Sequence, residues 1–216
     1  MPSTQYPITE TFLSVQSEGS LAGQAAFFIR FGGCNLTCQF TPTLKCDEKL
    51  HCDSENNSMI SSMELMILAR KSKTHNIIIT GGEPSLNGSV SKLIRYFRRE
   101  GYHVSVETNG HKIERLLDAN LITYSPKIGF SKGARQISYD EYLSFEHKGD
   151  IELKLLAGID NTPDTGRWED YPLKYLQAIN HEDTINITNA RYVSDFVATN
   201  PEWYTSFQAH KITKVR

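Results

Sequence analysis

The chain has 216 residues, of which 22% are charged and 39% hydrophobic, and its formal net charge is -2. This length suits one ordinary domain with its own core, and the charge balance gives no sign of a nucleic-acid or membrane surface. The sequence lacks a basic start followed by an apolar stretch, and it has no run of about 18 apolar residues. We therefore expect a single domain over residues 1–216, located in the cytoplasm, with no direct nucleic-acid or membrane partner.

Six apolar runs rich in β-branched and aromatic residues predict strands that are buried on both faces. In chain order they lie at 25–31, 76–80, 103–106, 121–124, 151–156 and 184–187. Helix-like stretches lie between or beside them, at 61–73, 90–100, 112–119, 139–147 and 167–179. The first of these opens with Ser61 and has Glu64 three positions later, which is the arrangement of a capping box.

Strand and helix alternate along the chain, which predicts an α/β fold with a mainly parallel sheet, because parallel neighbours need a long return connection. About six strands suit a partial (β/α) barrel, with an open doubly wound sheet as the alternative. Functional sites in both folds gather at the carboxyl ends of the strands. Four segments follow predicted strands and should meet at one rim: Cys34 to Cys38, Gly81-Gly82-Glu83-Pro84, Glu107-Thr108-Asn109-Gly110 and Ser125-Pro126-Lys127.

All four cysteines, Cys34, Cys38, Cys46 and Cys52, fall in one short stretch, whereas a disulfide framework usually spreads cysteines to close long loops. Thiolates are soft ligands suited to zinc or to an iron-sulfur cluster. Four thiolates on one ion would form a structural zinc site, whereas three would leave one iron of a cluster open for another ligand. The remaining alternative is that the cysteines are incidental thiols, some of them buried as small hydrophobic side chains.

Two segments resemble motifs of the radical S-adenosylmethionine (SAM) superfamily. Gly33-Cys34-Asn35-Leu36-Thr37-Cys38 resembles the opening of its cluster motif, and Thr80-Gly81-Gly82-Glu83-Pro84 resembles the strand-end motif that meets the SAM methionine amine. The resemblance implies a 4Fe-4S cluster on three cysteines, with SAM on the fourth iron. It also implies a set of SAM-binding residues: Gly82, Glu83, Glu107, Asn109, Ser125, Pro126 and Lys127.

The third cluster ligand departs from the superfamily pattern, because Thr41 stands three positions after Cys38, where the third cysteine is usual. The distance to the first predicted helix favours Cys46. The alternative is Cys52, because Cys52-Asp53-Ser54 is similar to the Cys-Asp-Thr of the family described next.

Within the superfamily, the resemblance is to the 7-carboxy-7-deazaguanine synthase family, and it spans nearly the whole chain. Residues 10–19 are similar to that family's N-terminal signature, although Ser17 replaces the more usual glycine, and Phe207-Gln208-Ala209-His210-Lys211 is similar to its C-terminal His-Lys motif. The resemblance implies radical SAM ring contraction of 6-carboxy-5,6,7,8-tetrahydropterin to 7-carboxy-7-deazaguanine with release of ammonia, in 7-deazapurine biosynthesis of the queuosine type. It further implies Mg²⁺, a hard cation that Ser54 would help to bind, or Glu48 if Cys46 is the third cluster ligand.

The same resemblance implies a substrate site. Its residues are Val15, Gln16, Ser17, Glu18, Arg30, Thr80 and, through the terminal carboxylate, Arg216, with His210 as the catalytic candidate that binds substrate or donates a proton. Arg30 offers a planar fork of donors that grips a carboxylate, and Gln16 and Glu18 suit a pyrimidine edge. Taken singly, Glu18 and Arg30 would more simply form surface salt bridges.

The resemblance also implies an electron donor such as flavodoxin or ferredoxin, and a homodimer. Two alternative functions remain open: a radical SAM activase that generates a glycyl radical on a partner protein, and a four-cysteine zinc-binding interaction module. An activase would have no use for the set Gln16, Glu18 and Arg30. Iron and sulfide analysis separates the zinc module from both enzymes.

Overall fold

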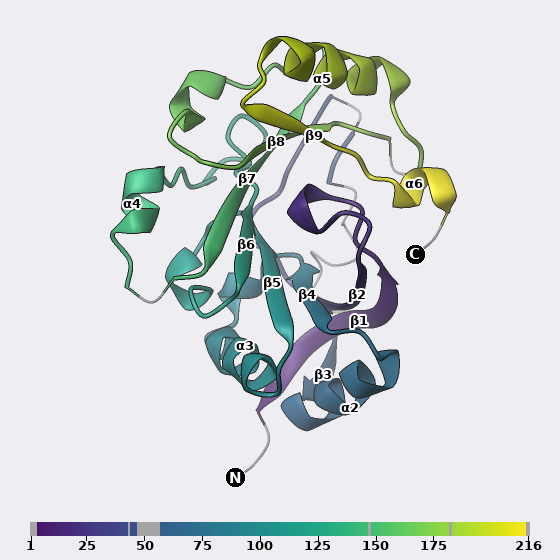
Figure 1. Ribbon diagram of the computed structural model, residues 1–216, viewed down its shortest axis with the longest axis vertical. Coiled ribbons are helices and arrows are strands. Elements are labelled where there is room, and N and C mark those ends of the chain that lie inside the picture. Colours follow the sequence, from purple (N-terminus) through teal and green to yellow (C-terminus); the bar gives the residue numbers. More distant parts are fainter. Residues whose placement is uncertain (1–3, 43, 47–56, 147, 182, 215–216) are drawn as a thin grey trace.

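The computed structural model describes residues 4–42, 44–46, 57–146, 148–181 and 183–214 (Figure 1). Its strands form one nine-stranded sheet in the order β3-β1-β2-β4-β5-β6-β7-β8-β9. The strands are β1 (Gln5–Val15), β2 (Ala25–Phe31), β3 (Ser58–Ser61), β4 (Asn76–Gly81), β5 (His103–Thr108), β6 (Leu121–Tyr124), β7 (Asp150–Ala157), β8 (Lys174–Ala178) and β9 (Trp203–Ser206). β1 pairs antiparallel with β2 and β3, and β2, β4 and the strands from β5 to β9 pair in parallel in that order.

The order of the strands runs in one direction, because each strand after β4 is added beside the one before it. A doubly wound sheet would reverse its order at a switch point, and right-handed crossovers in a sheet without reversal place the helices on one face. Figure 1 shows the helices that follow β3, β4, β6 and β8 around the outside of the sheet, whereas the last helix lies near the turn between β1 and β2. The helices are α2 (Ser62–Ser72), α3 (Val90–Arg99), α4 (Tyr139–Leu143), α5 (Ile187–Thr199) and α6 (His210–Thr213). This is the expected partial (β/α) barrel, although the sheet is larger than the predicted six strands.

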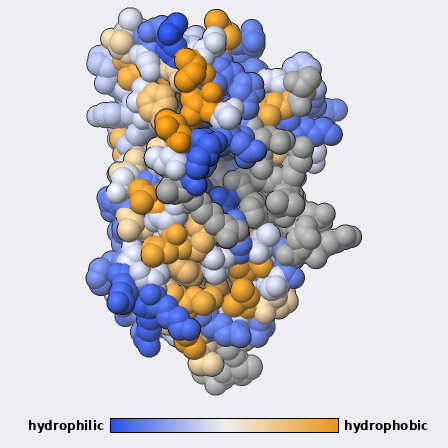
Figure 2. Space-filling view, turned by 90° about the vertical axis from the view of Figure 1, so that its right-hand side faces the viewer, coloured by the Kyte–Doolittle hydropathy of each residue, from blue (hydrophilic) through white to orange (hydrophobic). Residues whose placement is uncertain are grey.

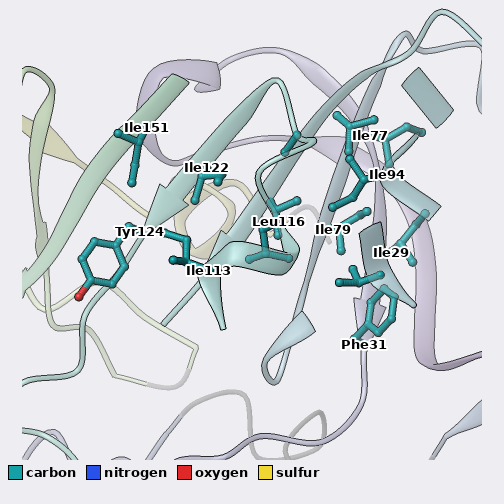
Figure 3. Close-up of a cluster of buried hydrophobic side chains, with 14 of the residues drawn as sticks. Ile29, Phe31, Ile77, Ile79, Ile94, Ile113, Leu116, Ile122, Tyr124 and Ile151 are labelled. Atoms are coloured by element: carbon teal, nitrogen blue, oxygen red, sulfur yellow. The ribbon is translucent and has the colours of Figure 1, made fainter. Parts of the chain in front are cut away.

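The outer face of the sheet, which meets the helices, is apolar. Ile77 and Ile79 of β4 lie beside Ile94 of α3, and Ile122 and Ile151 continue the same layer along the sheet (Figure 3). All of these side chains are buried in one cluster. Because successive side chains of a strand point to opposite faces, the residues between them must face the inside of the barrel.

The inner face of the sheet carries many polar side chains beside a smaller apolar group that includes Phe28 and Ile78. Thr80, Ser105, Thr123, Glu152 and Lys154 alternate there with the core residues and are all buried. Buried polar and charged groups are costly unless they are hydrogen-bonded or paired. An ordered network of such groups therefore lines the inside of the barrel, and the site is built from it.

The strongest local signals in the sequence located their elements correctly. β2 and β6 have the predicted bounds, and α2 begins after Ser61 as expected. The Ser61 hydroxyl accepts a hydrogen bond from the Glu64 N–H, and the Glu64 carboxylate accepts one from the Ser61 N–H. This capping box satisfies amide donors that the first turn of the helix leaves without partners.

Other expectations were wrong, most of them after residue 110. Residues 167–179 do not form one helix but a short 3₁₀ turn, η5 (Thr165–Trp168), and then strand β8. Every residue of β8 is buried, so the segment shows no alternation, and a short buried strand is then hard to distinguish from a buried helix.

The predicted strand at 184–187 is instead the approach to α5, whose first turn is capped by the Asn186 side chain. The predicted helix at 112–119 contains only one 3₁₀ turn, η4 (Ile113–Arg115), and α4 ends at Leu143 rather than at residue 147. β1, β3 and β9 were not predicted. β1 and β3 join the sheet through antiparallel pairs, which an alternation of strand and helix does not predict.

Exposed apolar side chains gather on the lower half of the face seen in Figure 2, where β1, β3 and α2 lie. The exposed apolar residues of these three elements are Leu13, Val15, Met59, Met63 and Ile67. Exposed apolar side chains that gather on one face often mark a contact with another chain. In the ranges that the structure describes, no helix is both long enough and apolar enough to span a bilayer.

Candidate active site

The carboxyl ends of the parallel strands surround one cavity. Cys34 and Cys38 after β2, Gly82 after β4, Asn109 after β5 and Lys127 after β6 all line it. The convergence that the strand-end positions predicted is therefore confirmed. The rest of the lining consists of Glu18, Phe40, Leu44, Cys46, Thr80, Gly81, Glu107, Thr108, Ser125, Lys154, Leu156, Gln177, Ala178, Ile179, Asn180 and Gln208.

Three cysteines share one small apolar cluster at this cavity. Cys38 is buried in it, and Cys34 and Cys46 pack against it. Burial raises the pKa of the Cys38 thiol to about 11, and the Lys127 ammonium opposes that rise. Within the described part of the chain, no three His, Cys, Asp or Glu side chains are grouped so as to hold a single metal ion. Each thiolate of a four-iron cluster binds its own iron, and three cysteines at one cavity fit that donor set.

Gly81 fixes the path of the chain where β4 leaves the sheet. Its φ is +119°, and a Cβ at this position would lie 2.1 Å from the Phe31 carbonyl oxygen. Only glycine tolerates such an approach between the ends of β4 and β2. The glycine pair of the strand-end motif therefore has a structural reason besides any contact with a ligand.

Glu83 is buried behind the wall of the cavity rather than in its lining. Its carboxylate accepts hydrogen bonds from the Ser85 N–H at 3.0 Å, the Thr108 hydroxyl at 2.7 Å and the Asn109 N–H at 2.7 Å. These bonds tie the end of β4 to the end of β5. Glu83 therefore stabilises the ends of the two strands, and its expected contact with SAM stays a prediction.

Asn109 links the strand ends to the cysteine segment. Its side-chain amide donates to the Asn35 side-chain oxygen at 2.9 Å and lies 3.9 Å from the Cys34 sulfur. On the next strand end, the Lys127 ammonium donates to the backbone oxygen of Ser125 at 2.8 Å and to its hydroxyl at 2.6 Å. Both side chains are thus held where the cavity meets the cysteines.

Glu107 joins three segments inside the barrel. One of its carboxylate oxygens accepts from the Gln16 amide at 3.0 Å, and the other accepts from the Thr80 hydroxyl at 2.8 Å. Gln16 in turn accepts from the N–H groups of Ser17 and Glu18. The expected substrate residues Gln16, Glu18 and Thr80 therefore belong to one network that is centred on Glu107.

The turn between β1 and β2 folds into the barrel through the single 3₁₀ turn η1 (Gly19–Leu21), the dark purple coil near α6 in Figure 1. Gly19 has a φ of +63°, and a Cβ there would lie 2.2 Å from a Glu152 carboxylate oxygen. Glu152 accepts from the Ser20 N–H at 3.0 Å and from the Thr123 hydroxyl at 2.8 Å. The turn is thus fastened to β7 and carries Glu18 to the cavity.

Glu18 forms a buried ion pair with Lys154 of β7, and their side chains are only 12% and 6% exposed. Burial alone would raise the pKa of Glu18, but the Lys154 ammonium, the Gln208 side chain and His210 together hold it below its usual value. Burial would lower the pKa of Lys154, and the neighbouring carboxylates Glu18, Glu107 and Glu152 reverse this and raise it. Both groups are therefore charged at neutral pH.

Sequence reasoning missed Lys154 and the segment from Gln177 to Asn180, which also line the cavity. Lys154 lies in a predicted strand, and a lysine between apolar neighbours in a buried strand was the available signal. The 177–180 segment was hidden because its strand was taken for a helix. Gln208, from the C-terminal motif, was not singled out although it also faces the cavity.

The remaining expected residues lie close to the cavity without lining it. The Ser17 hydroxyl and His210 Nδ1 are 2.7 Å apart, which brings the end of β1 and α6 together. Arg30 neighbours Thr80 in the sheet, lies 3.2 Å from Glu10 through its Nε and covers the Phe12 ring.

Val15 is 45% exposed at the end of β1. Pro126 lines a separate small pocket with Phe130 and Trp168. Their expected contacts with substrate and with SAM stay predictions. Cys52, Ser54, Glu48 and Arg216 lie outside the described residues.

A cavity lined by cysteines at the carboxyl ends of a partial barrel is the site of a radical SAM enzyme, and residues 28–128 match the Radical SAM superfamily. The chain is 30% identical to 7-carboxy-7-deazaguanine synthase of Synechocystis sp., over 99% of this chain and 95% of that protein. It is also 30% identical to the enzyme of the same name from Bacteroides thetaiotaomicron, over 97% and 98% of the two chains. The chain therefore belongs to the 7-carboxy-7-deazaguanine synthase family.

The fold agrees with this assignment. The crystal structure of QueE from Escherichia coli superposes with a TM-score of 0.64 and covers 94% of each chain at 22% identity. More distant folds include TYW1 with a lysine-pyruvate adduct, at a TM-score of 0.50, 14% identity and coverage of 81% of this chain and 73% of that one. The first likeness extends over nearly the whole chain.

Proposed function

We propose that the chain converts 6-carboxy-5,6,7,8-tetrahydropterin to 7-carboxy-7-deazaguanine with release of ammonia. The observation that carries this proposal is a single cavity lined both by Cys34, Cys38 and Cys46 and by the buried carboxylate of Glu18. A cluster alone would suit any radical SAM enzyme. The polar network around Glu18 and Glu107 adds the hydrogen-bonding groups that a pterin ring needs.

The residues at the cavity suit both cofactors. When bound, the 4Fe-4S cluster and SAM supply the one-electron chemistry that removes a hydrogen atom from the substrate. We assign Cys34, Cys38 and Cys46 as cluster ligands, since all three face one cavity. We assign Gly82, Asn109, Ser125 and Lys127 to SAM because they line the cavity at the same strand ends. Gln177 of β8 and Asn180 just after it extend that polar surface.

The substrate is assigned to the turn that enters the barrel. Glu18 offers a charged hydrogen-bond acceptor. Gln16 donates to Glu107 and so helps to hold the polar network beside the substrate in place. Arg30 neighbours Thr80 on the inner face and is our candidate for the substrate carboxylate, which would compete with Glu10 for the guanidinium. His210, held against Ser17, is the candidate for proton transfer.

Three expectations extend the proposal beyond these residues. Mg²⁺ would add a hard cation next to the cluster segment, with Glu48 as its candidate ligand beside Cys46, and with Ser54 if Cys52 is the third cluster ligand. An electron donor such as flavodoxin or ferredoxin would reduce the cluster. We further propose one catalytic domain that forms a homodimer in the cytoplasm, and the apolar surface over β1, β3 and α2 supports an interface between chains (Figure 2).

The proposal is tested by anaerobic reconstitution followed by metal analysis and SAM cleavage assays with and without the pterin. We expect iron and sulfide in equal amounts and formation of 5'-deoxyadenosine that increases with pterin concentration. Bound zinc without sulfide would contradict the enzyme assignment. If the rate of SAM cleavage does not depend on the pterin but increases with a partner protein, the result would instead support an activase.

A further inference from the structure

The inner face of the barrel places one lysine among three carboxylates. Lys154 is 5% exposed, and Glu18, Glu107 and Glu152 all act on its ammonium group. Burying a charge is costly unless it is paired, so each of these groups must have a structural reason to be there. The hydrogen bonds of the carboxylates show that they are not equivalent.

Two of the carboxylates are already held by other groups. Glu107 accepts from Gln16 and Thr80, and Glu152 accepts from the Ser20 N–H and Thr123. Glu18 differs, because the ammonium group of Lys154 is its charged hydrogen-bonding partner. Of the three, it also lies nearest in sequence to the turn that enters the barrel.

We infer that Lys154 is a positioning residue that holds the Glu18 carboxylate ionised and directed into the cavity, where it accepts the N–H donors of the substrate's aminopyrimidinone edge. This inference rests on the proposed function and deepens it, because it names the group that keeps the substrate-binding carboxylate charged and correctly oriented. Lys154 acts through Glu18 and not by its own contact with the substrate.

The charge of Glu18 depends on few neighbours. The charged and titratable groups that face it are Lys154 from β7 and His210 from α6, and Gln208 adds a neutral donor. Without the ammonium group, burial would raise the pKa of Glu18, so that the carboxylate would become protonated as the pH falls. A protonated Glu18 accepts N–H bonds less strongly, and substrate affinity would then decrease toward low pH.

The experiment measures the equilibrium affinity of the anaerobic, cluster-reconstituted protein for 6-carboxy-5,6,7,8-tetrahydropterin, at several pH values between about 6 and 8. Lys154→Met should weaken binding about 10- to 100-fold and make it weaker still at low pH. The wild type should lack this additional pH dependence, because any contribution of His210 is common to both proteins. Lys154→Arg, which keeps the charge, should recover most of the affinity.

The decisive comparison is made in a Glu18→Gln background. If Lys154 acts through Glu18, Lys154→Met should change the affinity of Glu18→Gln by less than about twofold. The double variant also buries no unpaired charge at this pair, so it should fold even if Lys154→Met is unstable. An equal loss of affinity in both backgrounds would overturn the inference, because Lys154 would then contact the substrate directly.

Lys174→Met is the matched control. Lys174 is also a buried lysine, on β8, but it donates to the Glu169 carbonyl oxygen and covers the Trp203 ring. Its loss should lower stability and leave pterin affinity unchanged. If the wild type binds the pterin and Lys154→Met binds it equally well, the inference is overturned but the proposed function is not. A wild type that binds no pterin would overturn the proposed function and the inference together.

Discussion

Gly19 gives a sharp test of how the β1–β2 turn is fastened inside the barrel. Its backbone is left-handed, with a φ of +63°, and a Cβ would lie 2.2 Å from a Glu152 carboxylate oxygen. In Gly19→Ala the left-handed backbone costs about 1–2 kcal/mol, and displacement of Glu152 from one of its two donors costs about 1.5–3 kcal/mol. We therefore expect the free energy of unfolding to fall by about 2.5–5 kcal/mol.

Gly23→Ala is the matched control for that substitution. Gly23 belongs to the same turn and has a φ of +88°, but a Cβ there would meet no atom within 4 Å. The free energy of unfolding of Gly23→Ala should fall only by the backbone cost of about 1–2 kcal/mol. Urea unfolding of the anaerobic proteins, followed by circular dichroism, measures both variants. Equal destabilisation by the two substitutions would refute the proposed packing of η1 against Glu152.

Two further predictions concern the cluster and the substrate. Cys46→Ala should abolish the absorbance of the reconstituted cluster as fully as Cys34→Ala or Cys38→Ala does, and loss of the cluster in Cys52→Ala but not in Cys46→Ala would reverse the assignment of the third ligand. Arg30→Lys should weaken pterin binding by about 1–3 kcal/mol with an unchanged iron content, because lysine lacks the planar fork of donors; unaltered affinity would refute that role.

The sequence located the site better than it located the whole fold. The cysteine segment and the segments after β4, β5 and β6 were found because each follows a strand whose apolar run is bounded by glycine or polar residues. Parallel strands bring such segments to one rim regardless of the helices between them. The errors at 112–119 and 167–179 therefore did not displace these parts of the site.

The parts of the site that were missed depend on contacts between distant segments. The pairing of Lys154 with Glu18 joins residues 136 positions apart, and no periodicity in the sequence reports such a contact. Gln177 and Asn180 were missed for a local reason, because a fully buried strand carries no alternation. The left-handed turn at Gly19 likewise becomes meaningful only once Glu152 is seen beside it.

The central claim is that the chain contracts the pterin ring. It is tested most directly by anaerobic incubation of the reconstituted protein with SAM, a reductant and 6-carboxy-5,6,7,8-tetrahydropterin carrying deuterium at C6, followed by mass spectrometry. The account predicts 7-carboxy-7-deazaguanine, released ammonia and deuterium in the 5'-deoxyadenosine. SAM cleavage without deuterium transfer and without the deazaguanine product, in a protein that contains the complete cluster, would contradict it.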